Sequence, residues 1–150
     1  MKFTCEYKYD GLRGQIHYNA GKCQIFSRNL ENLTEAYPDI VHFVLLSTKP
    51  EVKNFIIDSE IVAINTQTQK ILPFQTLSTR GRKNVDKNAI EVQVCIYVFD
   101  IIYFNDESLL KTQFSERRKY LREHFKEVSI EMLNNSLSQR LKTNYKSLNT

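Results

Sequence analysis

Cysteine is scarce in this sequence, and its spacing argues against the sites that cysteine most often builds. The three cysteines, Cys5, Cys23 and Cys95, are an odd number with no Cys-x-x-Cys pair, so neither a zinc site nor a disulfide framework is expected. Each lies in an apolar or strand-like stretch, which predicts reduced thiols in the core of an intracellular protein. The three histidines show no metal-ligand spacing, and we assign them no role.

Long apolar runs are missing as well. No run reaches the length that crosses a bilayer, and Glu6, Lys8 and Asp10 interrupt the region where a signal peptide would be apolar. A membrane or secreted protein is therefore not expected. There is also no internal repeat and no low-complexity segment. With 150 residues, 41% hydrophobic and 25% charged, the chain has the size and composition of one globular domain.

Positive charge is present but unevenly distributed. The formal net charge is +4, and residues 111–150 carry nine Lys/Arg against four Asp/Glu. A second basic cluster, Arg80, Arg82 and Lys83, lies in the middle of the chain. Each cluster is either a solvated face or a surface for an anionic partner.

The hydrophobic pattern predicts several strands followed by a helix. "GQIHYNAGKCQIFS" is typical of a hairpin that turns at Asn19-Ala20-Gly21-Lys22. Thr34 is a candidate N-cap for a helix, although Pro38 fits best if that helix begins there, and Ser115 is a candidate N-cap for a second helix with an apolar stripe at Tyr120, Leu121 and Phe125. Strands are expected at 3–8, 14–27, 54–65 and 92–104, helices at 34–46 and from 115, and a polar tail at 129–150. This order favours an α+β fold with mostly antiparallel pairing.

The segment "EYKYDGLR" combines groups that phosphate chemistry needs. In a strand, Glu6, Lys8 and Asp10 would share one face, Gly11 would allow a sharp turn, and Arg13 would offer a fork suited to phosphate. A lysine nucleophile must lose its proton, and flanking carboxylates oppose that loss, so a metal ion or further cations would be required. The alternative is a solvent-facing charge ladder on an edge strand.

Three further pieces carry weaker signals. Arg28 in "FSRN" follows a strand end. Asp58 and Glu60 share one face of an apolar strand, where metal coordination or hydrogen bonds to a ribose would offset their burial, unless that face is exposed. Phe99 in "YVFDIIY" is either a core residue or a ring that stacks on a base.

Taken in order, the segments "EYKYDGLR", "FSRN", "FIIDSEIVAI", "PFQTLSTRGRK" and "VQVCIYVFDIIY" resemble the nucleotidyltransferase (adenylation) domain of ATP-dependent DNA ligases, most closely the eukaryotic DNA ligase I type. The resemblance runs from about Phe3 to Phe125 and includes the specific Lys-x-Asp-Gly-x-Arg signature. It implies two mostly antiparallel sheets flanked by helices with the nucleotide between them, similar to ATP-grasp.

The resemblance also implies roles for individual residues. Lys8 matches the lysine that attacks the α-phosphate of ATP and carries AMP, and Glu6 matches the residue that reads the adenine amino group. The remaining matches are Arg13 and Arg28 near ribose, phosphate and nick, Glu60 near ribose and metal, and Phe99 stacked on adenine. The implied cofactors are ATP and Mg²⁺, the implied substrate is nicked duplex DNA, and the implied location is the nucleus. By this resemblance, Arg80, Arg82 and Lys83 would touch the DNA backbone.

Two later family motifs are not found in the sequence: a glutamate-glycine strand ending in lysine, and a Lys-x-Lys strand that grips the triphosphate. Residues 1–128 are therefore expected to be the N-terminal part of a ligase adenylation domain, incomplete at the C-terminal end. A truncated product, one half of a split protein and an incomplete gene prediction all stay open. Uncovered sheet edges would favour a completing partner. Besides a partial ligase, two functions are considered: an inert fragment that at most binds nucleotide or DNA, and a related RNA ligase or capping enzyme, against which "PFQTLSTRGRK" argues.

Overall fold

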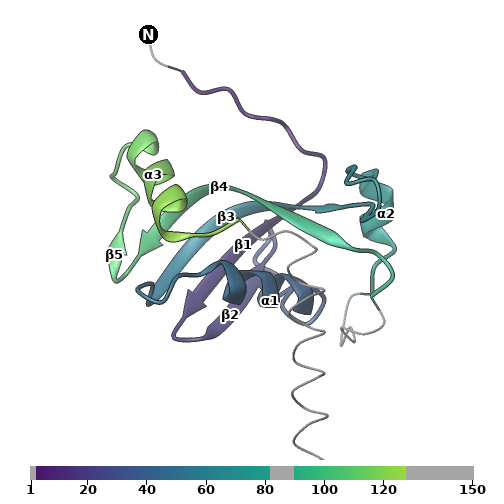
Figure 1. Ribbon diagram of the computed structural model, residues 1–150, viewed down its shortest axis with the longest axis horizontal. Helices are drawn as coiled ribbons and strands as arrows, with labels where there is room; N and C mark the ends of the chain where they lie inside the picture. The colour runs from purple at the N-terminus through teal and green to yellow at the C-terminus, as the bar shows by residue number, and fades with distance from the viewer. Residues whose placement is uncertain (1–2, 82–89, 128–150) are drawn as a thin grey trace, which may run out of the picture.

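The computed structural model describes residues 3–81 and 90–127, and its centre is an antiparallel sheet with strand order β2-β1-β3-β4-β5 (Figure 1). This confirms the α+β class with antiparallel pairing. The described residues form one sheet where two were expected. The elements are β1 (Leu12–Asn19), β2 (Lys22–Phe26), α1 (Pro38–Ser47), β3 (Asn54–Ala63), α2 (Phe74–Ser78), β4 (Val94–Phe104), β5 (Glu107–Ser108) and α3 (Phe114–His124).

The first two strands form the hairpin that the sequence predicts. Asn19 pairs with Lys22 across a two-residue loop. Both loop residues have positive φ, 46° at Ala20 and 84° at Gly21, as the hairpin turn that matches strand twist requires. Ala20 holds this conformation while its N–H donates to the Lys53 carbonyl at 3.0 Å.

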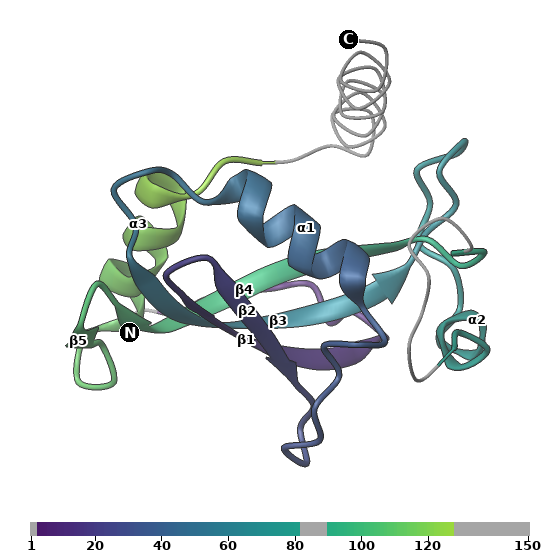
Figure 2. The ribbon, with the colours of Figure 1, turned by 90° about the horizontal axis from the view of Figure 1, so that it is seen from below.

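The two faces of the sheet differ in polarity because side chains alternate along each strand. Ile16, Ile57 and Ile61 lie on the inner face and are almost completely buried. They pack in one core with Ile40 and Val44 of α1, which lies across this face (Figure 2). The opposite face carries polar side chains, and the functional residues described below lie there.

Neither Thr34 nor Ser115, the residues predicted as N-caps, caps its helix, α1 or α3. Helix α1 starts at Pro38, where the fixed φ suits the first turn and the missing N–H removes no helical bond. Thr34 instead accepts a hydrogen bond on Oγ1 from the N–H of Ile25 at 3.0 Å. Ser115 lies inside α3, which Gln113 precedes. The predicted stripe is confirmed: Tyr120, Leu121 and Phe125 pack against the core.

The N-terminal segment corrects two expectations. Residues 3–10 are not a strand. Side-chain contacts with β4 and α3 hold this segment, and not the backbone hydrogen bonds that join neighbouring strands. Cys5 is therefore exposed and is not a core thiol, whereas Cys23 is buried, and Cys95 is half-buried. All three are free thiols, and burial raises the pKa of Cys23 to about 11.

Arg80 is a further correction, because it does not lie on a basic surface. Its side chain is 3% exposed and forms a fork with Asp39, with Nη2–Oδ1 at 2.6 Å and Nη1–Oδ2 at 3.0 Å. Its remaining donors reach the carbonyl oxygens of Ala36 and Val92, so it is unavailable for DNA. Arg82, Lys83 and the tail at 129–150 lie outside the described residues. None of the helices in the described part of the chain is long and apolar enough to cross a membrane.

Candidate active site

Residues 3–10, here called the N-terminal strap, leave the sheet on the side opposite α1 (Figure 1). Among the described residues, a ring stack and an ion pair hold the strap. The Tyr9 ring stacks on Tyr97 of β4 with centroids 4.0 Å apart, and Glu6 forms an ion pair with Arg118 of α3 at 2.7 Å. The exposed Lys8 lies between these two contacts.

A cavity of about 490 Å³ opens between the strap and the polar face of the sheet. Five of the six residues expected in the site line this cavity. One comes from the strap, three come from β1, β3 and β4, and one lies just past the end of β2. The lining consists of Tyr7, Lys8, Tyr9, Gly11, Leu12, Arg13, Arg28, Glu60 and Phe99. Residues far apart in the sequence are thus brought into one site.

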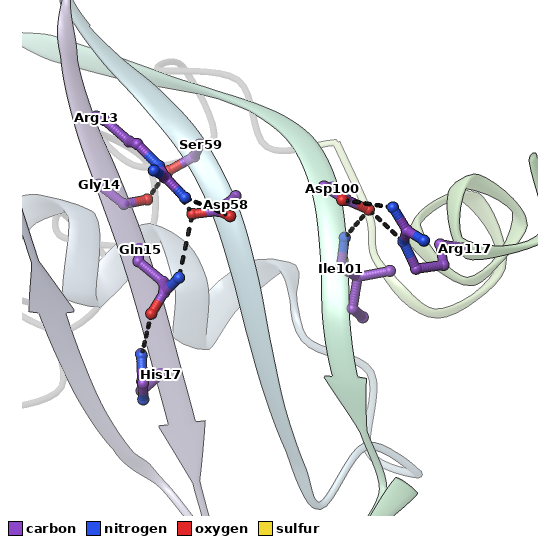
Figure 3. Close-up of polar contacts among 9 residues, drawn as sticks. All are labelled: Arg13, Gly14, Gln15, His17, Asp58, Ser59, Asp100, Ile101 and Arg117. Atoms are coloured by element: carbon purple, nitrogen blue, oxygen red, sulfur yellow. Dashed lines mark hydrogen bonds and ion pairs between the residues drawn. The ribbon is translucent and has the colours of Figure 1, made fainter. Parts of the chain in front are cut away.

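Pairing between β1 and β3 sets the acidic wall of this cavity. Arg13 lies opposite Glu60, and Gln15 lies opposite Asp58. Arg13 forms a fork with Asp58, with Nη2–Oδ2 at 2.8 Å and Nε–Oδ1 at 3.2 Å (Figure 3). Because hydrogen bonds to Asp58 favour the charged guanidinium, the pKa of Arg13 is raised. The fork offsets the burial of Asp58 and leaves Glu60 as the carboxylate that lines the cavity.

Glu60 sits in a mixed environment. Burial raises the pKa of its carboxyl, and the Gly11 N–H together with the charges of Lys8 and Arg13 opposes that rise. Lys8 and Glu60 line the same cavity, and the positive charge of Lys8 favours the ionised form of the Glu60 carboxyl. A carboxylate between two cations in a half-buried cavity suits a phosphate-bound cation or a ribose hydroxyl.

Phe99 lies on this face at an irregularity in β4. Asp58 pairs with Asp100 and Ser59 pairs with Val98, so Phe99 is the extra residue of a bulge. Bulges re-aim side chains and occur often beside active sites. Arg117 of α3 anchors the strand directly after this point, donating from Nε and Nη2 to Asp100 at 2.8 Å each (Figure 3).

Comparison with known proteins decides the family. The model of the ATP dependent DNA ligase domain matches residues 1–147. The chain belongs to this family. Among curated relatives, it is 56% identical over 129 residues to DNA ligase 1 of Drosophila melanogaster, covering 85% of the chain and 17% of the relative. It is 51% identical over 126 residues to DNA ligase 1 of Arabidopsis thaliana, covering 83% of the chain and 16% of the relative. The chain therefore spans about a sixth of the length of these relatives.

A solved structure agrees with this assignment. The ligase domain of M. tuberculosis LigD is 25% identical with a TM-score of 0.62, and the match covers 78% of this chain and 35% of that one. The antiparallel sheet and its helices are thus the arrangement of a ligase nucleotidyltransferase domain.

Not every residue that the ligase signature suggests lies in the cavity. Glu6 does not line it, but lines a neighbouring cavity of about 510 Å³ that shares Tyr7, Tyr9 and Phe99 with the first. The sequence also gave no role to the Tyr9–Tyr97 stack or to Arg118. The only sequence signal for Arg118 is its place in the charged run "SERRK", which does not tell a site arginine from a solvated one.

Gly11 of the ligase signature is required by packing. A Cβ at this position would lie 2.3 Å from the Ile61 carbonyl oxygen and 3.0 Å from Cγ of Glu60. We expect Gly11→Ala to push the strap away from β3. If Lys8 accepts AMP from ATP, this change should lower the rate of transfer about 10²-fold, because displacement by about 1 Å is enough for such a loss. The rate of label transfer from ATP labelled on the α-phosphate measures this.

Gly21→Ala is the matched control for this change. Gly21 has nothing within 4 Å of its Cβ position, so its substitution strains only a positive φ at a distant turn, at a cost of about 1 kcal/mol in stability. Adenylation by this variant should equal that of the wild type. Equal rates for Gly11→Ala and the wild type would contradict the packing argument.

Proposed function

We propose that this chain carries the nucleotide-transfer site of an ATP-dependent DNA ligase that seals nicks in duplex DNA in replication, repair and recombination. Lys8 accepts AMP as the neutral amine, after its ammonium has lost one proton to solvent: Nζ forms a bond to the α-phosphorus, the bond from that phosphorus to the bridging oxygen breaks, and pyrophosphate leaves with the electron pair while Nζ loses its second proton to solvent. The observation that carries this proposal is the cavity in which Lys8, Arg13, Arg28, Glu60 and Phe99 meet.

Each wall of the cavity suits one part of the nucleotide. Arg13 and Arg28 supply positive charge where charge develops on the phosphate oxygens, which is the main requirement of phosphoryl transfer. Phe99 offers a ring face for the base, and Glu60 is placed for the ribose. A solved structure of mycobacterial DNA ligase D is described as a complex with ATP, which supports the same nucleotide for this chain.

The residues present also fit a magnesium ion that arrives with the nucleotide. Mg²⁺ is usually held by one or two carboxylates together with substrate phosphates, and Glu60 supplies such a carboxylate beside two cationic side chains. Within residues 3–81 and 90–127 there is no cluster of three acidic, histidine or cysteine ligands that would hold a metal alone. When bound, the ion would neutralise charge on the transferring phosphate.

Substrate and location follow from the proposed activity. We infer nicked double-stranded DNA as the acceptor of the AMP group, other ligase segments or a second polypeptide as partners, and a nuclear location inside the cell. The positively charged residues of the cavity rim, Arg13 and Arg28, are the described candidates for contact with the 5′-phosphate of a nick.

The test is direct. The chain is incubated with Mg²⁺ and ATP labelled on the α-phosphate, and the protein is then separated on a denaturing gel. We expect label on the protein, acid-labile as a phosphorus–nitrogen bond should be, with peptide mapping placing the nucleotide on Lys8. Label on another residue, or none at saturating ATP, would overturn the proposal and favour an inert nucleotide- or DNA-binding fragment.

A further inference from the structure

The second cavity is formed by three elements that meet beside Phe99. The strap forms one side, β4 forms the floor and α3 forms the other side. Its lining consists of Thr4, Cys5, Glu6, Tyr7, Tyr9, Tyr97, Val98, Phe99, Phe114, Ser115, Arg118 and Arg122. Aromatic and apolar groups dominate this lining, and Glu6 is the one carboxylate among its described residues. Both cavities contain two arginines, but Arg118 of the second cavity is paired with Glu6, and the first cavity adds Lys8 to Arg13 and Arg28. The first cavity therefore suits the phosphates and the second the base of one nucleotide.

Arg118 links two walls of the second cavity. Its Nη1 donates to Glu6 Oε1 at 2.7 Å and to the Phe99 carbonyl oxygen at 2.7 Å. The guanidinium lies over the Phe114 ring, 5.7 Å from the centroid, which fixes its plane. The side chain is 33% exposed, so it is partly shielded from water. One arginine thereby ties the strap to the bulge at Phe99.

We propose that Arg118 is a positioning residue for base recognition: it holds the Glu6 carboxylate beside Phe99 so that the second carboxylate oxygen accepts a hydrogen bond from the amino group of adenine. This inference rests on the proposed function. Among the described residues, Glu6 Oε2 receives no hydrogen bond, so it is available to a ligand. A carboxylate accepts only, so it attracts an amino group and repels a carbonyl oxygen at the same place on a purine.

The arrangement also explains why an arginine suits this position. Lysine has three N–H donors but no planar group to stack, so it would lose the contact with the Phe114 ring that orients the side chain. The guanidinium bonds the carboxylate and the carbonyl oxygen together while it stacks. It thereby sets the distance between Glu6 and the ring that the base would contact.

The experiment compares ATP with purine riboside triphosphate, which lacks the amino group. The full chain and its Arg118→Gln variant are titrated with each nucleotide by calorimetry, and adenylation rates are measured in parallel. We expect Arg118→Gln to lower the ratio of the affinity for ATP to that for purine riboside triphosphate about tenfold, since a hydrogen bond to a charged group is worth at least this much. Binding of purine riboside triphosphate should stay within about threefold. Arg118→Lys should fall between the two.

Lys119→Gln is the matched control, because Lys119 follows Arg118 on α3, pairs with Glu116 and is not among the described residues that line either cavity. It should keep the full preference for ATP. If Arg118 has only a structural role, Arg118→Gln should weaken the binding of both nucleotides equally, and that result would overturn the inference. An unchanged preference overturns it as well, while the proposed function stands. A wild-type chain that binds neither nucleotide overturns the proposed function and this inference together.

Discussion

Lys8→Arg should abolish label transfer from α-labelled ATP, with a fall of at least about 10³-fold, as is typical when a nucleophile is removed. Arginine keeps the positive charge at the cavity but stays protonated at all accessible pH values. It therefore has no lone pair with which to attack phosphorus. ATP affinity should stay within about threefold of the wild type, because the charge and the neighbouring Arg13 and Glu60 are kept. Gel analysis and calorimetry measure the two quantities separately.

The control for this change is Lys22→Arg, a chemically identical substitution at the exposed end of the β1–β2 hairpin. It should label like the wild type. If Lys8→Arg also labelled at the wild-type rate, another group would have to be the acceptor, and the assignment of Lys8 would fail. If it lost ATP binding and labelling alike, Lys8 would act in binding and its role as nucleophile would lack support.

Arg80→Met should destabilise the chain by about 3–5 kcal/mol, the range for removing one partner of a buried ion pair. Methionine fills much of the same volume, but it leaves the Asp39 carboxylate without its fork and two carbonyl oxygens, of Ala36 and Val92, without donors. It also removes the guanidinium that lies 4.8 Å from the centroid of the Tyr37 ring. Urea unfolding followed by far-UV circular dichroism measures the free energy of unfolding.

Lys119→Met is the matched control for Arg80→Met. Lys119 also pairs with a carboxylate, Glu116 at 2.9 Å, but the two side chains are 53% and 49% exposed, so the loss should stay below about 1 kcal/mol. Arg80→Lys keeps the charge without the fork and should be intermediate. A loss below about 1 kcal/mol for Arg80→Met would show that the buried network does not hold the start of α1 to the segment before β4.

In the proposed function, the strap would let the cavity bind and release a nucleotide. Lys8 and Glu6 lie on a segment without ladder hydrogen bonds, attached by one ring stack and one ion pair. Such a segment adjusts to a ligand more easily than a strand does. The arginines and Glu60 belong to the sheet or its adjoining turn, so one wall of the cavity is rigid and the other is adaptable.

Local patterns in the sequence were sufficient for the hairpin, the two long strands and the apolar stripe of α3. In each case the deciding information lies within a few residues: a positive-φ glycine at Gly21, β-branched runs in β3 and β4, and helical spacing at 120–125. The order of the signature segments likewise pointed to the ligase family, because the sequence itself carries that order. Five of the six expected site residues line one cavity.

Only the tertiary structure decided which charges are partners and where Glu6 lies. The pairs Arg13–Asp58, Arg80–Asp39 and Arg118–Glu6 join residues 45, 41 and 112 positions apart, and no local periodicity specifies such partners. Arg80 looked like a surface charge because burial of an arginine depends on a fork supplied by a distant segment. The strap alternates like a strand, yet strand formation needs a neighbour with free ladder groups. Phe99 lies at a bulge that only the register of β3 and β4 reveals.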